Sequence, residues 1–177
     1  KEYKGHGYEI TDIRFDDASN TMFATCGGDK NVFLWDIATA KTLRKFWGHS
    51  QRINCITFNP QCNVLLSGSF DQTVLFYDLK AFNKSKPFYK LGSQYFKDSV
   101  TDLLFTEYEI FAVCMDGHLR TFDIRNGKMI KDHACNQGLT SVSLTGDGKC
   151  VLISCLDDTL RLMNKLNGKL LNEYSHS

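Results

Sequence analysis

The chain has 177 residues, of which 42% are hydrophobic, and its 21 lysines and arginines nearly balance 20 aspartates and glutamates. This composition is typical of a globular protein and excludes a disordered chain. A membrane-spanning helix needs about 20 consecutive apolar residues, whereas the longest apolar run, from Ile110 to Met115, holds six. The net charge of +1 excludes binding to nucleic acid or anionic membranes through overall charge, so any such site must be a local patch.

Short apolar segments separated by turn residues run along the whole chain and predict β-strands. In chain order, we expect a strand over residues 1–4 and then four units at about 7–47, 50–91, 98–132 and 138–174, each with four strands. The turns between the strands include Asn59-Pro60-Gln61 and Gly146-Asp147-Gly148. The last unit is expected to end in a strand over 169–174.

Three features recur once in each unit and show that the units are repeats. An apolar strand ends at Trp35-Asp36, Tyr77-Asp78, Phe122-Asp123 and Met163-Asn164, with spacings of 42, 45 and 41 residues. An aspartate stands six residues earlier, at Asp29, Asp71, Asp116 and Asp157. Apolar residues also recur at relative positions one, four and six of an upstream strand: Ile10, Ile13 and Phe15; Ile53, Ile56 and Phe58; Val100, Leu103 and Phe105; Leu139, Val142 and Leu144.

The apolar pattern indicates that each small sheet is covered on both faces. Ile10 and Ile13 cannot share a face under strict alternation, and the segment from Val32 to Trp35 is apolar on both sides. Sheets stacked radially around an axis cover each other in this way. The sequence therefore predicts an all-β fold, a β-propeller with four visible blades of four antiparallel strands.

The Gly-His pairs at Gly5-His6 and Gly48-His49, with Trp35-Asp36 between them, resemble the WD-repeat family. The resemblance covers the whole chain but weakens along it, since no Gly-His pair precedes the third unit and the last ends in Met163-Asn164. It implies one propeller segment over 1–177. Because family propellers most often have seven blades, we expect these four to belong to a larger ring, or two copies to associate through the open blade faces.

The resemblance also implies a buried hydrogen-bonded network in the stronger repeats. The matching positions are His6, Thr25, Asp29 and Trp35 in the first unit and His49, Ser67, Asp71 and Tyr77 in the second. In the later units the Ser or Thr position holds Ala112 and Ile153. We expect a complete network in the first unit, a partial one in the second, and a structural rather than catalytic role for both.

No other pattern indicates chemistry. The seven cysteines form no Cys-x-x-Cys pair and lie mostly in apolar runs, which favours core thiols in a reducing compartment. The five histidines lack metal-ligand spacing, and Thr145 to Cys150 does not fit a phosphate-binding loop. No secretory leader is visible. We therefore expect no catalytic, cofactor or metal site, and a cytoplasmic or nuclear location.

Residues 80–97 form a basic stretch without an acid. Aromatic residues, Phe82 among them, alternate with its lysines Lys80, Lys84, Lys86, Lys90 and Lys97. Lysines bind phosphates and aromatic rings stack on bases, so nucleic acid or an acidic partner is one interpretation. A solvated connector is the interpretation that we favour, because charge runs usually lie in solvent.

In the WD-repeat pattern, partners bind at rim positions just before the first strand of a blade, two residues later, and just before the turn aspartate. The corresponding residues are Glu9, Thr11 and Gly28; Arg52, Asn54 and Phe70; Ser99, Thr101 and Met115; Gly138, Thr140 and Leu156. Phe70, Met115 and Leu156 are expected to form an apolar row beside Arg52, the kind of residues that anchor protein interfaces.

Several strings resemble a narrower group of the family, the mitogen-activated protein kinase organizer group. They include Gly5 to Ile10, Leu66 to Asp71, Leu156 to Leu162 and Gly168 to Tyr174. This resemblance implies a non-catalytic scaffold for the components of a signalling cascade. It also implies an alternative, a subunit associated with pre-mRNA splicing, while a small-ligand or enzymatic propeller would require a deep polar pocket at the axis.

Overall fold

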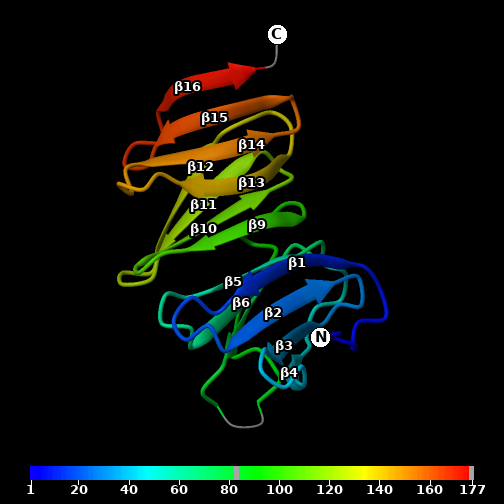
Figure 1. Cartoon of the computed structure of the whole chain (residues 1–177). Helices are drawn as coiled ribbons and strands as arrows, with labels where there is room; N and C mark the ends of the chain where they lie inside the picture. The colour runs from blue at the N-terminus through cyan, green and yellow to red at the C-terminus, as the bar shows by residue number, and fades with distance from the viewer. Residues whose placement is uncertain (82–83, 176–177) are drawn as a thin grey trace.

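The computed structural model describes residues 1–81 and 84–175, which form four separate four-stranded antiparallel sheets (Figure 1). The sheets of blades one and two are built from β1 (Ile10–Phe15), β2 (Met22–Gly27), β3 (Val32–Asp36), β4 (Thr42–Phe46), β5 (Ile53–Phe58), β6 (Val64–Ser69), β7 (Val74–Asp78) and β8 (Tyr89–Leu91). Those of blades three and four are built from β9 (Val100–Phe105), β10 (Glu109–Cys114), β11 (His118–Asp123), β12 (Lys128–His133), β13 (Leu139–Leu144), β14 (Cys150–Cys155), β15 (Thr159–Asn164) and β16 (Leu170–Ser175). The described residues include no helix long and apolar enough to cross a membrane.

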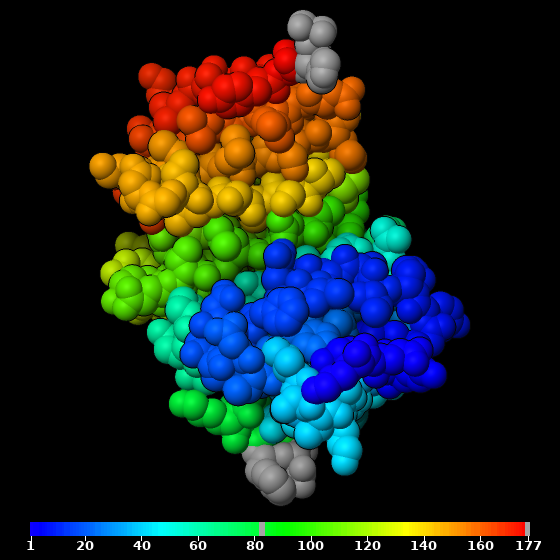
Figure 2. All heavy atoms as spheres, viewed as in Figure 1, coloured from blue at the N-terminus to red at the C-terminus, as the bar shows by residue number. Residues whose placement is uncertain are grey.

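Each blade is a meander in which consecutive strands pair, and the first strands of the blades lie side by side. β1 packs beside β5, β5 beside β9, and β9 beside β13. The blades therefore follow one another in chain order. In Figure 2 blade four (orange to red) lies above blade three (green), and blade one (blue) fills the front of the lower part. The predicted all-β fold with propeller blades is confirmed, whereas a seven-bladed ring stays a prediction.

A β-bulge lies near the start of the first strand of every blade. The pairing register shifts between Ile10 and Asp12 in β1, and β5, β9 and β13 shift at the equivalent place. One extra residue reverses the alternation of side chains. Ile10 and Ile13 therefore reach the same face, which explains a spacing that strict alternation does not allow.

Three apolar layers of the core lie between neighbouring blades, and a smaller aromatic cluster lies within blade one. Ile53, Ile56 and Phe58 of β5 pack on Ala24 and Leu34 of blade one. The same positions of β9 and β13 pack on the blades before them. Each blade thus covers the next, as expected for radial stacking.

Blade one has no preceding blade, and the residues at its first-strand positions are exposed. The exposed fraction is 48% for Ile13 and 0% for its counterpart Ile56. At the other end of the stack, Leu160 and Tyr174 of blade four are exposed as well. Both end faces are therefore open to a further blade or a second copy.

The predicted strand over residues 1–4 is wrong, because these residues form no strand. Tyr3 instead packs edge-on against Phe23 and Trp35, with ring centroids 4.8 and 5.7 Å away. The N-terminal segment covers an aromatic cluster of blade one, and side-chain packing takes the place of strand pairing.

Candidate interaction surface

Rim residues of all four blades occupy equivalent positions where the first strand of each blade begins. In each blade the residue before the turn aspartate donates its backbone N–H to the carbonyl of the residue before the first strand. The pairs are Gly28 to Glu9, Phe70 to Arg52, Met115 to Ser99 and Leu156 to Gly138, with N–O distances of 2.9 to 3.1 Å. The rim is therefore a rigid, repeated framework on which the side chains differ.

Arg52 and Phe70 form an open part of this rim. The Arg52 guanidinium lies over the exposed Phe70 ring, 5.6 Å from its centroid. Both residues line a hollow of about 410 Å³ together with Lys30 and Gln51. An exposed aromatic ring beside an arginine is a common anchor of protein interfaces.

Met115 and Leu156 form a second apolar feature of the rim. A Cβ added to Gly138 would lie only 2.7 Å from the Met115 sulfur and 3.1 Å from a Leu156 methyl group, so both side chains close over this glycine. Leu156 is exposed, whereas Met115 is half-buried. The predicted apolar row therefore offers Phe70 and Leu156 to a partner more fully than Met115.

The bulge residues Thr11, Asn54 and Thr101 each donate a hydrogen bond to the next blade, although Thr11 is also exposed. The Thr11 hydroxyl donates to the Ile53 carbonyl at 2.6 Å, and Thr101 donates to Leu139 at 2.7 Å. Asn54 donates to the Val100 carbonyl at 2.7 Å. These three rim positions use their polar atoms to join blades, which leaves them little to offer a partner.

Three further rim residues differ in exposure. Ser99 is buried, and its hydroxyl accepts a hydrogen bond from Asn54. Thr140 is exposed, although its hydroxyl pairs with that of Ser154 at 2.7 Å. Glu9 is exposed beside Gly28. Of these three, Glu9 and Thr140 are accessible to a partner.

The structure brings His6, Thr25, Asp29 and Trp35 into one hydrogen-bonded chain. Because the carboxylate of Asp29 accepts, His6 Nδ1 donates to it at 2.8 Å. The Thr25 hydroxyl pairs with His6 Nε2 at 2.7 Å and accepts from Trp35 Nε1 at 2.8 Å. Every polar group of the set has a partner, and the chain ties the rim loop to the strands of blade one.

In blade two, His49, Ser67 and Asp71 meet in the same way, but Tyr77 does not join them. His49 contacts Asp71 at 2.9 Å and Ser67 at 2.7 Å. The buried Tyr77 hydroxyl has no hydrogen-bond partner among the described residues. Burial favours a higher pKa for Asp71, but hydrogen bonds from His49, Thr73 and Ser50 hold that pKa well below its ordinary range.

Blade three replaces the histidine network with a buried ion pair. The Arg120 guanidinium, fully buried, donates to both oxygens of Asp116 at 3.0 and 2.5 Å. Phe96 stands where the histidine would be, and its ring centroid lies 5.2 Å from Arg120. Burial opposes ionisation of Asp116, yet Arg120 lowers the pKa of its carboxyl to about 2.

Blade four also has an arginine–aspartate pair in place of the histidine network, with Cys135 at the histidine position. The Cys135 thiol and Arg161 both donate to Asp157, at 2.9 and 2.8 Å. Cys135, Cys155 and Asp157 bring possible metal ligands within 4.8 Å of one another, but the carboxylate is already satisfied by these donors. We did not predict either arginine; the sequence signal is an arginine four residues after the turn aspartate, which the first two blades lack.

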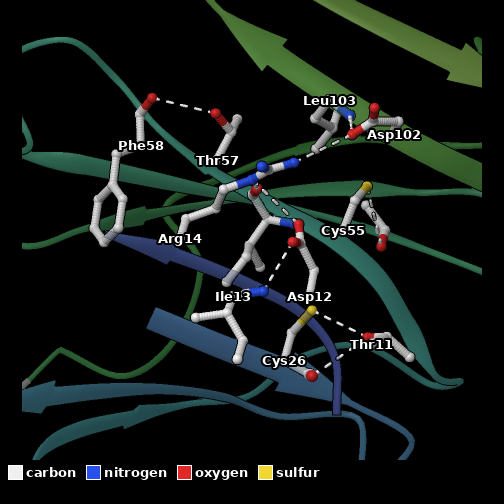
Figure 3. A network of polar contacts seen from close by, with 12 residues as sticks. Thr11, Asp12, Ile13, Arg14, Cys26, Cys55, Thr57, Phe58, Asp102 and Leu103 are labelled. Atoms are coloured by element: carbon white, nitrogen blue, oxygen red, sulfur yellow. Dashed lines mark hydrogen bonds and ion pairs between the residues drawn. The ribbon is translucent and has the colours of Figure 1, made fainter. Parts of the chain in front are cut away.

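A second polar network joins the inner strands near the axis (Figure 3). Asp12 accepts the Ile56 backbone N–H at 3.0 Å, and Asp102 accepts that of Val142 at 3.0 Å. Arg14 lies 3.4 Å from Asp12 and 3.7 Å from Asp102. The carboxylates thus clamp neighbouring blades, and the adjoining hollow of about 550 Å³ between the ends of β1, β5, β9 and β13 is open to solvent.

The structure separates the five lysines of the basic stretch. Lys97 lies at the rim, where its backbone N–H donates to Asp116, and Lys80 follows the turn at Asp78. Lys84 and Lys86 line a hollow with Trp47 and Phe88, and Lys90 lies in β8. Phe82 lies outside the described residues.

Comparison with known proteins places WD repeats in this chain. Residues 1–36 and 40–78, which include the two histidine networks, match the family described as WD domain, G-beta repeat. The chain is 27% identical, over 97% of its length, to the WD repeat domain-containing protein 83 homolog of Dictyostelium discoideum, and it covers 60% of that protein. It is 39% identical, over 44% of its length, to the WD repeat domain-containing protein 83 of Rattus norvegicus and covers 24% of it.

A more distant relative is the CCR4-associated factor 4 homolog of Vanderwaltozyma polyspora, which is 22% identical over 71% of the chain, corresponding to 21% of that protein. The chain thus spans less than two thirds of the length of each of these three relatives. The family model itself matches blades one and two.

Proposed function

We propose that this WD-repeat chain is a non-catalytic scaffold whose rim gathers components of a mitogen-activated protein kinase cascade in the cytoplasm or nucleus. The observation that carries the proposal is the pair Arg52 and Phe70, exposed beside a hollow on an otherwise rigid rim. The strings that resemble the mitogen-activated protein kinase organizer, together with the similarity to WD repeat domain-containing protein 83, support the choice of partner.

The geometry of the rim suits a scaffold because the binding residues are held before a partner arrives. Backbone hydrogen bonds fix Phe70 to Arg52 and Leu156 to Gly138, so little conformational entropy is lost on binding. Association with the splicing machinery would use the same rim, and the identity of the bound proteins distinguishes these two roles. A small-ligand role has less support, since the axial carboxylates Asp12 and Asp102 are engaged between blades.

The test is a pull-down from lysate, read by mass spectrometry, that compares the native chain with the double variant Arg52→Glu/Phe70→Ala. A matched control is Arg125→Glu/Tyr108→Ala, because Arg125 stacks on the exposed Tyr108 ring at 4.7 Å in turns at the opposite end of blade three. We expect the rim variant to lose a set of partners that the control retains.

The outcome decides both the surface and the role. Loss of kinases supports the cascade scaffold, and loss of splicing proteins assigns the same rim to splicing. Equal retention by the native chain and the rim variant would remove the rim from the proposal.

The open end faces support a separate proposal of self-association. Ile13 and Phe15 at one end and Leu160 and Tyr174 at the other occupy repeat positions that are buried between neighbouring blades. Light scattering of the isolated chain is expected to show assemblies that Ile13→Asp dissociates, and a monodisperse monomer would contradict this.

A further inference from the structure

We propose that the outer edge of blades one and two binds single-stranded nucleic acid, through a basic aromatic site made of Trp47, Lys84, Lys86 and Phe88. These four residues line a hollow of about 620 Å³ together with Ser85 and Pro87. The site uses none of the rim residues, so it is independent of the proposed scaffold function.

The aromatic rings of this site are presented to solvent. Trp47 is 48% exposed, in contrast to 2% for Trp35, and Phe88 is exposed as well. The next residue in the chain, Tyr89, is a third exposed ring. Two exposed rings, Trp47 and Phe88, thus line this hollow, while Tyr89 lines a neighbouring hollow beside Phe76.

The backbone holds the site in shape. Trp47 donates its N–H to the Ser85 carbonyl at 3.2 Å, and Phe88 donates to Phe76 at 2.9 Å. Gly48 adopts a φ of +149°, and a Cβ there would lie 3.2 Å from Pro87. Glycine thus permits the close approach that brings Trp47 beside the lysine segment.

The charge of the site is positive and has no acid within the segment itself. Residues 80–97 contain five lysines and no aspartate or glutamate. The Lys86 ammonium lies 5.0 Å from the centroid of the Trp47 ring, so a cation already occupies one aromatic face. Asp78, the acid nearest in sequence to Lys84 and Lys86, accepts backbone N–H groups of Lys80 and Ala81.

Single-stranded nucleic acid satisfies both features of the site. Its phosphates pair with Lys84 and Lys86, while its unpaired bases stack on Trp47 and Phe88. An acidic peptide would pair with the lysines but leave the exposed rings without a partner. A duplex would offer phosphates while its bases stay stacked in the helix.

The test titrates the full chain with fluorescently labelled ten-nucleotide oligouridine and, separately, oligothymidine at low salt. We expect the labelled strands to gain polarisation and the protein to lose tryptophan fluorescence, because Trp47 is the exposed one of the chain's two tryptophans. Trp47→Ala is expected to weaken binding by about tenfold or more, whereas Trp47→Phe retains most of it. Unequal affinity for the two strands identifies the natural polymer.

The lysines are tested with a charge-matched pair of variants. Lys84→Gln/Lys86→Gln is expected to weaken binding and to reduce the salt dependence by about 1.4 in slope, which corresponds to two phosphates. Lys80→Gln/Lys97→Gln removes the same charge outside the hollow and is expected to change affinity little. Circular dichroism of each variant verifies that the fold is kept.

Three results would overturn the proposal. Equal weakening in the two lysine pairs would show diffuse attraction without a site. Polyglutamate that displaces the oligonucleotide and binds as tightly, without a change in tryptophan fluorescence, would assign the lysines to an acidic protein. Absence of binding to either strand at low salt would remove the site.

Discussion

Blades one and two differ from blades three and four in how they satisfy the same half-buried aspartate. In the first pair, a histidine from the preceding loop donates to Asp29 or Asp71. In the second pair, an arginine four residues downstream donates to Asp116 or Asp157. The carboxylate acceptor is the constant part of the repeat, and the donor is the part that changes.

The two solutions have different energetic consequences. A histidine network consists of modest hydrogen bonds whose loss costs about 1–3 kcal/mol for each buried group left without a partner. A buried ion pair carries a large desolvation penalty, so removal of one partner leaves a charge that nothing compensates. Blade three is therefore expected to be more sensitive to single substitutions than blade one or two.

The strongest test of this contrast is Asp116→Asn. Arg120 is fully buried and would keep its charge, so we expect the free energy of unfolding to fall by about 3–5 kcal/mol. The double variant Asp116→Asn/Arg120→Met removes the charge and is expected to recover most of the loss. Urea unfolding followed by circular dichroism measures all three proteins.

A surface ion pair provides the control for that experiment. Asp123 pairs with the exposed Arg125 at 3.0 Å, and Asp123→Asn is expected to cost less than about 1 kcal/mol. A similar cost for Asp116→Asn would mean that Arg120 finds another acceptor or reaches water, and the proposed difference between the blades would disappear.

Substitutions of Thr25 and Ser67 allow the stabilities of the two histidine networks to be compared directly. The Thr25 hydroxyl forms hydrogen bonds with both His6 and Trp35, whereas the Ser67 hydroxyl forms one with His49. We expect Thr25→Val to cost about 2–3 kcal/mol and Ser67→Ala about 1 kcal/mol. Thr25→Ser, which keeps the hydroxyl, is the control, and equal costs in thermal or urea unfolding would contradict the difference.

The sequence was sufficient to predict the blades because their periodicity lies in short-range patterns. The spacing of Trp35, Tyr77, Phe122 and Met163 located all four units, and their apolar positions predicted the layers between blades. The bulge was not predicted, because an extra residue in a strand depends on pairing with a partner strand. The spacing of Ile10 and Ile13, which strict alternation does not allow, was the only sign of the bulge in the sequence.

The candidate site was harder to predict than the fold. The repeat pattern predicted the rim positions. It could not show that the side chains of Thr11, Asn54 and Thr101 donate hydrogen bonds to the next blade. It also missed Arg120 and Arg161, because the family pattern directs attention to histidines. Three-dimensional packing decides which of several equivalent positions faces solvent, and a local sequence pattern does not contain that information.

The dependence of stability on acid pH tests the contribution of the Asp116–Arg120 ion pair in blade three. The pKa of Asp116 is lowered to about 2 from 3.8, so its contribution to stability is present above about pH 4 and is lost as the pH falls toward 2. The contribution is on the order of 2 kcal/mol. In urea unfolding between pH 7 and 2, the gap between the native chain and Asp116→Asn is expected to narrow by about 2 kcal/mol over that window, and a constant gap would contradict the assignment.

The smallest expected effect comes from Tyr77→Phe. In blade one the Trp35 N–H completes the network, but the equivalent Tyr77 hydroxyl is buried without a partner among the described residues. Removal of an unsatisfied group from the core costs nothing, so we expect a change within about 0.5 kcal/mol or a slight stabilisation. A loss above about 1 kcal/mol in thermal unfolding would show that Tyr77 shares the Ser67 hydroxyl, as Trp35 shares that of Thr25. Blades one and two would then hold equivalent networks, and the repeat would change its chemistry only once, between blades two and three.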